Sequence, residues 1–268
     1  MRKVRLIGAP TDCNSSFLRG PAKAPARIRA LLFSDMGNMA AESGGILGGD
    51  IGFEDAGDLP LTESAGDAAL ITAATAAACA AGDVPLVIGG DHMISFPAVR
   101  GVAGHHGPVN ILHFDAHPDL YDDFGGNPAS HASPFARIME AGLALRLVQV
   151  GIRTLNPHQR EQAARFGVEI VPMRDFAAGL VPIPPGPLYV SIDLDGLDPA
   201  CAPGVSHHEP GGLTTRQLLD VLARIDGPIV GADIVELNPD RDINDMTAAV
   251  AAKLVKELAA IAMRDQPA

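Results

Sequence analysis

Short apolar runs alternate along the chain with longer segments in which apolar residues recur at helical spacing. The short runs are rich in β-branched residues, which is typical of buried strands. An eighth strand is expected near residues 46–53, where glycine interrupts the pattern. Seven runs with clearer ends predict strands at Val4–Ile7, Leu86–Ile88, Val109–Phe114, Leu145–Val150, Val168–Val171, Leu188–Ile192 and Ile229–Ile234.

Cap motifs and helical spacing mark the segments between these strands. Ser64 begins an S-x-x-D motif before an alanine-rich run, and Thr214 begins a T-x-x-Q motif. We therefore expect helices over residues 64–81, 214–225 and 245–263. Alternating strands and helices predict βαβ units and an α/β fold with a parallel sheet covered on both faces. No linker-like change of composition divides the chain, so we expect one domain over residues 1–268.

Composition and charge narrow the class of protein. Of the 268 residues 47% are hydrophobic, which suits a large buried core, and the formal net charge is −12. That charge disfavours nucleic acid as a partner and suits a cationic small substrate. No apolar stretch approaches the roughly 18 residues that a membrane helix needs. Cys13, Cys79 and Cys201 lie far apart, which argues against disulfides and zinc-thiolate sites. We expect a cytoplasmic protein.

Titratable side chains gather where three predicted strands end. The segments are PLVIGGDH, VNILHFDAHPD and LYVSIDLDGLDP. In parallel sheets, ligands bind at the carboxyl ends of strands, and extended backbone points residues i, i+2 and i+4 to one side. A single D-x-D motif is a common helix cap. Three segments that each carry His or Asp residues at the end of a predicted strand together indicate one site. Its candidate metal ligands are His92, Asp115, His117, Asp119, Asp193 and Asp195.

The charges of this predicted site require cations. Four carboxylates in one pocket would repel each other strongly, and two divalent ions would balance them. Oxygen-rich ligation with two imidazoles and no thiolate favours Mn²⁺, and leaves zinc, cobalt and iron open. Two metals that share a water lower its pKa toward neutrality. The sequence therefore predicts a hydrolase with two Mn²⁺ per subunit.

Two further residues are candidates for catalysis. His131, in NPASHASPF, follows the second metal segment by a loop and could carry a proton over the pocket, or could be a surface histidine. Glu236 ends the strand IVGADIVE, where it could pair with a substrate cation or cap the next turn. His207 and His208 follow the third metal segment and are candidates for the mouth of the pocket.

The motifs GGDH, DAHPD, SHASPF, SIDLDGLDP and ADIVELNP stand in the order and spacing of the ureohydrolase (arginase/agmatinase) family, which this chain resembles. The resemblance is closest to the plant arginase branch, through HPDLYDDFGGNPASHASPFARIME and GVSHHEPGGL. It implies an α/β/α sandwich with an eight-stranded parallel sheet, manganese, and hydrolysis of a guanidinium group to urea and an amine. It also implies a homo-oligomer, either a trimer or a hexamer.

The resemblance also assigns roles to residues. A metal-bridging hydroxide would attack the guanidinium carbon, Glu236 would hold its nitrogens, and His131 would pass a proton to the leaving amine. One metal would be held by His92, Asp115, Asp119 and Asp193, and the other by Asp115, His117, Asp193 and Asp195.

Substrate choice depends on the residues around this centre. The resemblance places substrate contacts at Tyr121, Asn127 and Asn156, and Asn156 stands where other arginases carry an acid. We favour L-arginine, with agmatine second and guanidinobutyrate or formiminoglutamate after them. An inactive metal-binding homologue is the alternative from another class, and the presence of the ligand set with His131 and Glu236 argues against it.

Overall fold

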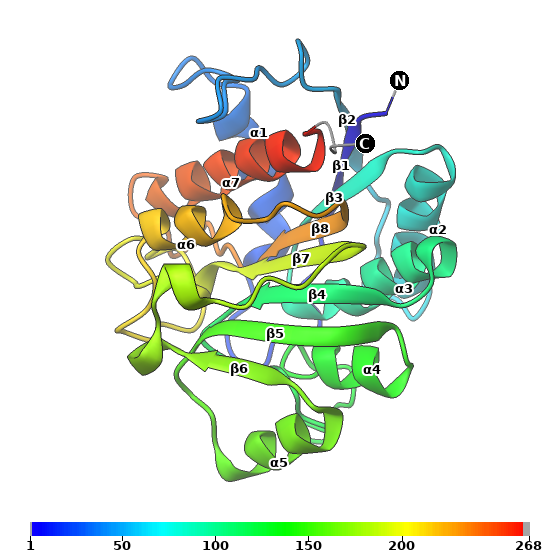
Figure 1. Cartoon of the computed structure of the whole chain (residues 1–268), viewed down its shortest axis with the longest axis vertical. Helices are drawn as coiled ribbons and strands as arrows, with labels where there is room; N and C mark the ends of the chain where they lie inside the picture. The colour runs from blue at the N-terminus through cyan, green and yellow to red at the C-terminus, as the bar shows by residue number, and fades with distance from the viewer. Residues whose placement is uncertain (1, 265–268) are drawn as a thin grey trace.

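The fold is built on one eight-stranded sheet whose neighbouring strands all pair in parallel (Figure 1). The computed structural model describes residues 2–264. The strands lie in the order β2-β1-β3-β8-β7-β4-β5-β6. They span Val4–Ala9 (β1), Phe53–Asp58 (β2), Val84–Gly89 (β3), Val109–Phe114 (β4), Ala144–Ile152 (β5), Glu169–Pro172 (β6), Leu188–Asp193 (β7) and Ile229–Val235 (β8).

Helices cover both faces of the sheet (Figure 1). Helices α1, α6 and α7 pack on one face, and α2, α3, α4 and α5 pack on the other. The predicted three-layer α/β/α sandwich is therefore confirmed. The helices span Ala24–Leu32 (α1), Asp67–Ala80 (α2), Ser95–His106 (α3), Pro134–Glu140 (α4), Pro157–Phe166 (α5), Thr215–Leu222 (α6) and Met246–Ala262 (α7).

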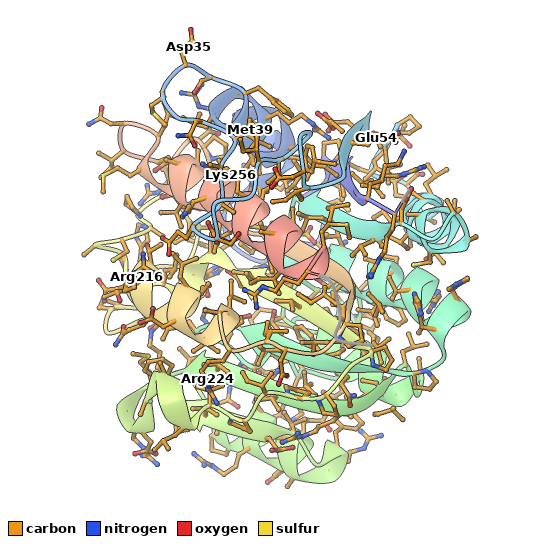
Figure 2. All side chains as sticks on the ribbon, turned by 45° about the horizontal axis from the view of Figure 1, so that its top comes forward. Asp35, Met39, Glu54, Arg216, Arg224 and Lys256 are labelled. Carbon is orange, nitrogen blue, oxygen red and sulfur yellow. The ribbon has the colours of Figure 1, made fainter. Side chains whose placement is uncertain are left out.

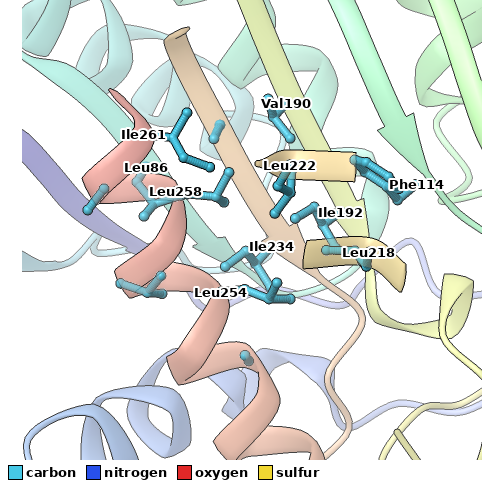
Figure 3. Packing of buried hydrophobic residues seen from close by; sticks show 14 of the residues in the cluster. Leu86, Phe114, Val190, Ile192, Leu218, Leu222, Ile234, Leu254, Leu258 and Ile261 are labelled. Carbon is cyan, nitrogen blue, oxygen red and sulfur yellow. The ribbon is translucent and has the colours of Figure 1, made fainter. Parts of the chain in front are cut away.

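The strands are apolar on both faces because each face contributes to a separate core. In β4, Ile111 belongs to the core under α2 and α3, whereas its neighbour Leu112 belongs to the core under α7. Figure 3 shows Leu254 and Leu258 of α7 pointing at Ile234 of the central strand β8. Such alternation produces continuous apolar runs, which is why the pattern predicts these strands well.

Seven predicted strands are present, with ends that differ from the prediction by no more than two residues. The strand expected near residues 46–53 is wrong: this segment forms turns, with Gly48 at φ 78°, and β2 begins only at Phe53. The helix expected from Ser64 begins at Asp67, because the Ser64 hydroxyl donates to the Asp67 carboxylate instead of capping the helix. At α6 the predicted capping box is confirmed.

A long segment between α1 and β2 crosses over α7. Figure 2 shows Met39 of this segment close to Lys256 of α7, whose ammonium donates to the Asn38 carbonyl (2.9 Å). The segment is also tied to α6, because Arg216 forms an ion pair with Glu42 (2.6 Å).

No helix within residues 2–264 has the length and apolar character needed to cross a membrane.

Candidate metal centre

The carboxyl ends of the central strands β3, β8, β7 and β4 bring the predicted ligands together. His92 begins a 3₁₀ turn directly after β3, and the chain turns into it at Gly90, where a Cβ atom would lie 1.6 Å from the Thr11 carbonyl oxygen. Only glycine fits this approach. The Asp91 carboxylate accepts the Met93 amide (3.0 Å), which holds the turn that presents His92.

One half of the cluster surrounds His92. Its Nδ1 atom lies 3.3 Å from Asp115 Oδ2, 3.0 Å from Asp119 Oδ2 and 3.1 Å from Asp193 Oδ2. All four residues are buried, and Asp119 adopts a left-handed backbone conformation at φ 50°. Strained backbone of this kind costs free energy and persists where surrounding structure fixes it.

The other half surrounds His117. Its Nδ1 atom lies 3.1 Å from Asp195 Oδ2 and 3.4 Å from Asp115 Oδ1. Asp115 thus faces both imidazoles, one with each carboxylate oxygen. The Asp193 side chain accepts the Asp195 amide (2.8 Å), which ties the β7 end to the 3₁₀ turn Leu194–Gly196 that carries Asp195. The structure therefore brings all six predicted ligands into one cluster.

The residues fit divalent cations. His92 Nδ1 is fully buried and has no hydrogen-bond partner, although three carboxylate oxygens lie within 3.3 Å of it. Burial, followed by the charges of Asp195 and Asp115, holds the pKa of Asp193 well above its usual range, and burial also raises the pKa of Asp195 to about 6. A divalent cation would occupy the nitrogen lone pair and compensate the carboxylates.

His113 contacts the cluster and was missed by the sequence reasoning. Its Nε2 atom lies 2.9 Å from Asp115 Oδ2, within the group formed with His92 and Asp115. The Gln149 amide nitrogen lies 2.6 Å from the Pro118 carbonyl and 3.1 Å from His113 Nδ1, so it donates to both. His113 Nδ1 is therefore an acceptor, its proton lies on Nε2, and the ring donates to Asp115. The signal was its position two residues before Asp115 on the same face of β4.

The second ring nitrogen of His92 is held from below the cluster. Nε2 lies 3.0 Å from the Ser191 hydroxyl, which itself donates to Asp233 (2.6 Å). Tyr189 donates to the other oxygen of Asp233 (2.7 Å), and all of these side chains are buried. This chain of hydrogen bonds fixes the ring of His92, with Nδ1 aimed at the carboxylates.

His131 and Glu236 form a buried pair beside the cluster. His131 Nδ1 lies 2.8 Å from Glu236 Oε1, which also accepts the His92 amide (2.8 Å). On the other side of the ring, the Ser16 hydroxyl lies 2.8 Å and the Ser16 amide 3.2 Å from His131 Nε2. Burial lowers the pKa of His131, but the charge of Glu236 outweighs burial and raises it to about 9. Glu236 adopts φ 66°, which is again strained for a residue with a side chain.

A cavity of about 260 Å³ opens onto the cluster. Its walls include Tyr121 and His207, as the sequence suggested, together with Thr154, Gln159 and Glu209, which sequence reasoning did not single out. The remaining lining residues are Ser16, His117, Asp119, Phe124, His131, Ala132, Asp193, Asp195 and Glu236.

The two predicted asparagines lie elsewhere. Asn156 caps α5: its side-chain oxygen Oδ1 accepts the Gln159 backbone amide (2.9 Å), and its side-chain Nδ2 donates to the Tyr121 hydroxyl (2.5 Å). Asn127 closes a surface turn by accepting the Ala129 amide (2.9 Å). Neither asparagine lines the cavity. Asn156 therefore positions Tyr121 from behind the cavity wall.

Known proteins resemble this chain over most of its length. The model of the Arginase family matches residues 2–260. Arginase 1, mitochondrial, from Arabidopsis thaliana is 50% identical over 272 aligned residues, which cover 95% of this chain and 80% of the relative. The structure of an arginase from Medicago truncatula superposes with a TM-score of 0.93 at 47% identity, covering 97% of this chain and 87% of that one. A proclavaminate amidino hydrolase from Streptomyces clavuligerus superposes with a TM-score of 0.89 at 32% identity, covering 97% and 92%.

One expectation is corrected by these relatives. The prediction of a cytoplasmic protein is wrong, because the similar plant proteins are named as mitochondrial or as chloroplastic and mitochondrial enzymes. Composition and membrane-span length do not report the compartment of a protein without membrane helices.

Proposed function

This chain belongs to the arginase family, and from that premise we propose that it hydrolyses L-arginine to L-ornithine and urea at the cluster of six His and Asp ligands. The family resemblance predicted from the motifs is confirmed, and with it the class of hydrolases that act on guanidino groups. The observation that carries the proposal is the pair of imidazole nitrogens, His92 Nδ1 and His117 Nδ1, that face the Asp115 carboxylate from two sides, beside the cavity that His117 lines.

We propose two Mn²⁺ ions per subunit as the metals. Two bound divalent cations would supply Lewis acidity and lower the pKa of a shared water toward neutrality. Support comes from the oxygen-rich donor set and from the bare, buried Nδ1 atom of His92. The holding residues would be His92, Asp115, Asp119 and Asp193 for one ion, and Asp115, His117, Asp193 and Asp195 for the other.

Glu236 and His131 would act on the substrate itself. Hydrolysis adds water across the bond between the guanidinium carbon and the side-chain nitrogen, and the leaving amine needs one proton. Glu236 lines the cavity as a buried carboxylate whose Oε1 atom already accepts from His131 and from the His92 amide, so its Oε2 atom would accept from a guanidinium nitrogen. His131 lines the same cavity, and because the charge of Glu236 outweighs burial and raises the pKa of His131 to about 9, its ring is an imidazolium that can give one proton to the leaving nitrogen.

Agmatine is the second candidate. No lysine or arginine is among the residues that line the described cavity, so no full cation awaits the α-carboxylate of arginine. Agmatine carries the guanidinium and an ammonium group without that carboxylate. 4-Guanidinobutyrate is less favoured than both, because it carries a carboxylate without an ammonium group and no lysine or arginine lines the described cavity.

The test is urea release by the Mn²⁺-loaded protein with L-arginine, agmatine and 4-guanidinobutyrate. We expect the highest kcat/KM for L-arginine, no activity after the metal is removed by chelation, and recovery on adding Mn²⁺. A protein that folds and binds metal but releases urea from none of these compounds would overturn the proposal. We also propose a trimer or hexamer, which light scattering of the metal-loaded protein would distinguish from a monomer.

A further inference from the structure

One acidic side chain in the cavity has no part in the mechanism proposed above. Glu209 lies at the rim, and its Oε1 atom is 4.0 Å from Nε2 of His117. The opposite ring nitrogen of His117 faces the cluster, so one imidazole ring separates Glu209 from the ligand oxygens. The side chain is 40% exposed, which leaves its carboxylate open to the cavity and to solvent.

The backbone of Glu209 is anchored to the metal segment. Arg153 donates to the Glu209 carbonyl through Nε (2.9 Å) and Nη2 (2.5 Å), and Nη2 also donates to the Asp195 carbonyl (2.7 Å). On the other side of the loop, Asp198 accepts the amide of Gly211 (2.7 Å). These contacts place the loop that carries Glu209 in a fixed position over the cluster.

The other acids of the cavity already have assigned partners. Asp119, Asp193 and Asp195 face imidazole nitrogens, and Glu236 is paired with His131 through Oε1 and is assigned above to the guanidinium. Within residues 2–264, Glu209 has no lysine or arginine within ion-pair distance. A rim carboxylate of this kind attracts a cation that extends out of the cavity.

We propose that Glu209 determines specificity by binding the ammonium group that a substrate carries at the far end of its alkyl chain from the guanidinium. This inference rests on the proposed function and deepens it. The ammonium of extended arginine or agmatine lies roughly 7 Å from the guanidinium carbon, from bond lengths of about 1.5 Å. Glu236 and Glu209 line the same cavity, the first buried and the second part-exposed at the rim, so an extended substrate has a carboxylate at each of its charged ends. Asn156 does not take this role, because its side chain caps α5 and donates to the Tyr121 hydroxyl.

The test compares wild type with Glu209→Gln in the Mn²⁺-loaded protein, using L-arginine, agmatine, 4-guanidinobutyrate and 1-butylguanidine. We expect KM for arginine and agmatine to rise about tenfold, with kcat within about threefold, because one charge-assisted contact is lost at a part-exposed site. For 1-butylguanidine, which has no distal charge, kcat/KM should stay within about twofold, and for 4-guanidinobutyrate it should stay equal or rise.

Two further variants control this comparison. Glu54→Gln makes the same charge change at an equally exposed acid (41%) on the edge strand β2, and should leave all four substrates unaffected. Glu209→Asp keeps the charge and should restore most of the preference for substrates with an ammonium group. Thermal unfolding of each variant checks that it is folded.

The outcomes separate the two proposals. Wild-type protein that releases no urea from any of the four compounds would overturn the proposed function. If the wild-type protein releases urea, but Glu209→Gln loses kcat/KM equally for substrates with and without the ammonium group, the role of Glu209 is overturned and the proposed function stands. An unchanged KM for arginine in Glu209→Gln would also overturn the role of Glu209.

Discussion

Replacing Ser191 with alanine removes the hydroxyl that joins His92 to Asp233. In the wild-type protein His92 Nε2 lies 3.0 Å from Ser191 Oγ, and Ser191 donates to Asp233 (2.6 Å). Because Ser191 has to donate to the carboxylate, it accepts the Nε2 proton of His92. The lone pair of the neutral ring is thereby directed to Nδ1, which faces the cluster. Without the hydroxyl, the tautomer of His92 is no longer specified.

The magnitude follows from the two groups left without a partner. His92 and Asp233 are both fully buried, and an unmade hydrogen bond to a buried group costs about 1–3 kcal/mol. Asp233 keeps its bond from Tyr189, so we expect about 2 kcal/mol less unfolding free energy for the metal-free variant. Loss of a group that orients a metal ligand typically weakens metal binding by about 10- to 100-fold. We expect a loss in that range for Mn²⁺.

The assay is a chelator-buffered Mn²⁺ titration of Ser191→Ala, together with urea denaturation of the metal-free protein. Ser95→Ala is the matched control, since the Ser95 hydroxyl is equally buried but has no hydrogen-bond partner. It should bind Mn²⁺ like wild type and lose little stability. Equal Mn²⁺ affinities for Ser191→Ala and wild type would refute the reasoning, as would equal losses for the two serine variants.

Three further variants test other parts of the site. Asp195→Asn should lose most of its bound metal and most of its urea release; wild-type metal content by elemental analysis would contradict the two-metal assignment. Glu236→Gln should lower the unfolding free energy of the metal-free protein by about 3 kcal/mol below pH 6.5. The pair of charged His131 and Glu236 stabilises the folded state fully below the usual histidine pKa, and this stabilisation is lost as the pH rises through about 9. A difference in unfolding free energy that does not shrink between about pH 6 and pH 10 would rule out this pair as its source. Asn156→Ala should cost about 1 kcal/mol in urea denaturation through the lost cap of α5, and Asn156→Asp should keep that cap.

The strands could be predicted because each buried strand serves two cores at once. Ile111 and Leu112 face opposite helical layers, and both must be apolar, so the run stands out from its surroundings. The edge strand β2 gives no such signal. Its sequence, FEDAGD, is largely polar and partly exposed, and the apolar residues that precede it pack as turns against the core under α7. A strand of that kind is defined by its pairing with β1 and not by its own pattern.

The cluster of His and Asp side chains could be predicted because its members follow strands that end at one edge of the sheet. The rim could not. Glu209 reaches the cavity through Arg153, which holds its carbonyl from a loop 56 positions earlier in the chain. Asn156 has the residue type of a substrate ligand, yet its hydrogen bonds are used by Tyr121 and the α5 amide. Residue type and spacing carry no information on such long-range partners.

The residues beneath the cluster share one row of the sheet. The parallel registers pair Gln149 with His113, His113 with Ser191, and Ser191 with Asp233, so four buried polar side chains cross β5, β4, β7 and β8 in line. Such a row is costly in a core unless its members satisfy each other. Here each side chain makes at least one hydrogen bond, although Gln149 Oε1 has no partner among the described residues, and the row contacts both the Asp115 and His92 side chains above it. The four polar side chains therefore support the candidate metal centre from below. None of their positions stands out in the sequence by itself, because only the strand register places the four residues side by side.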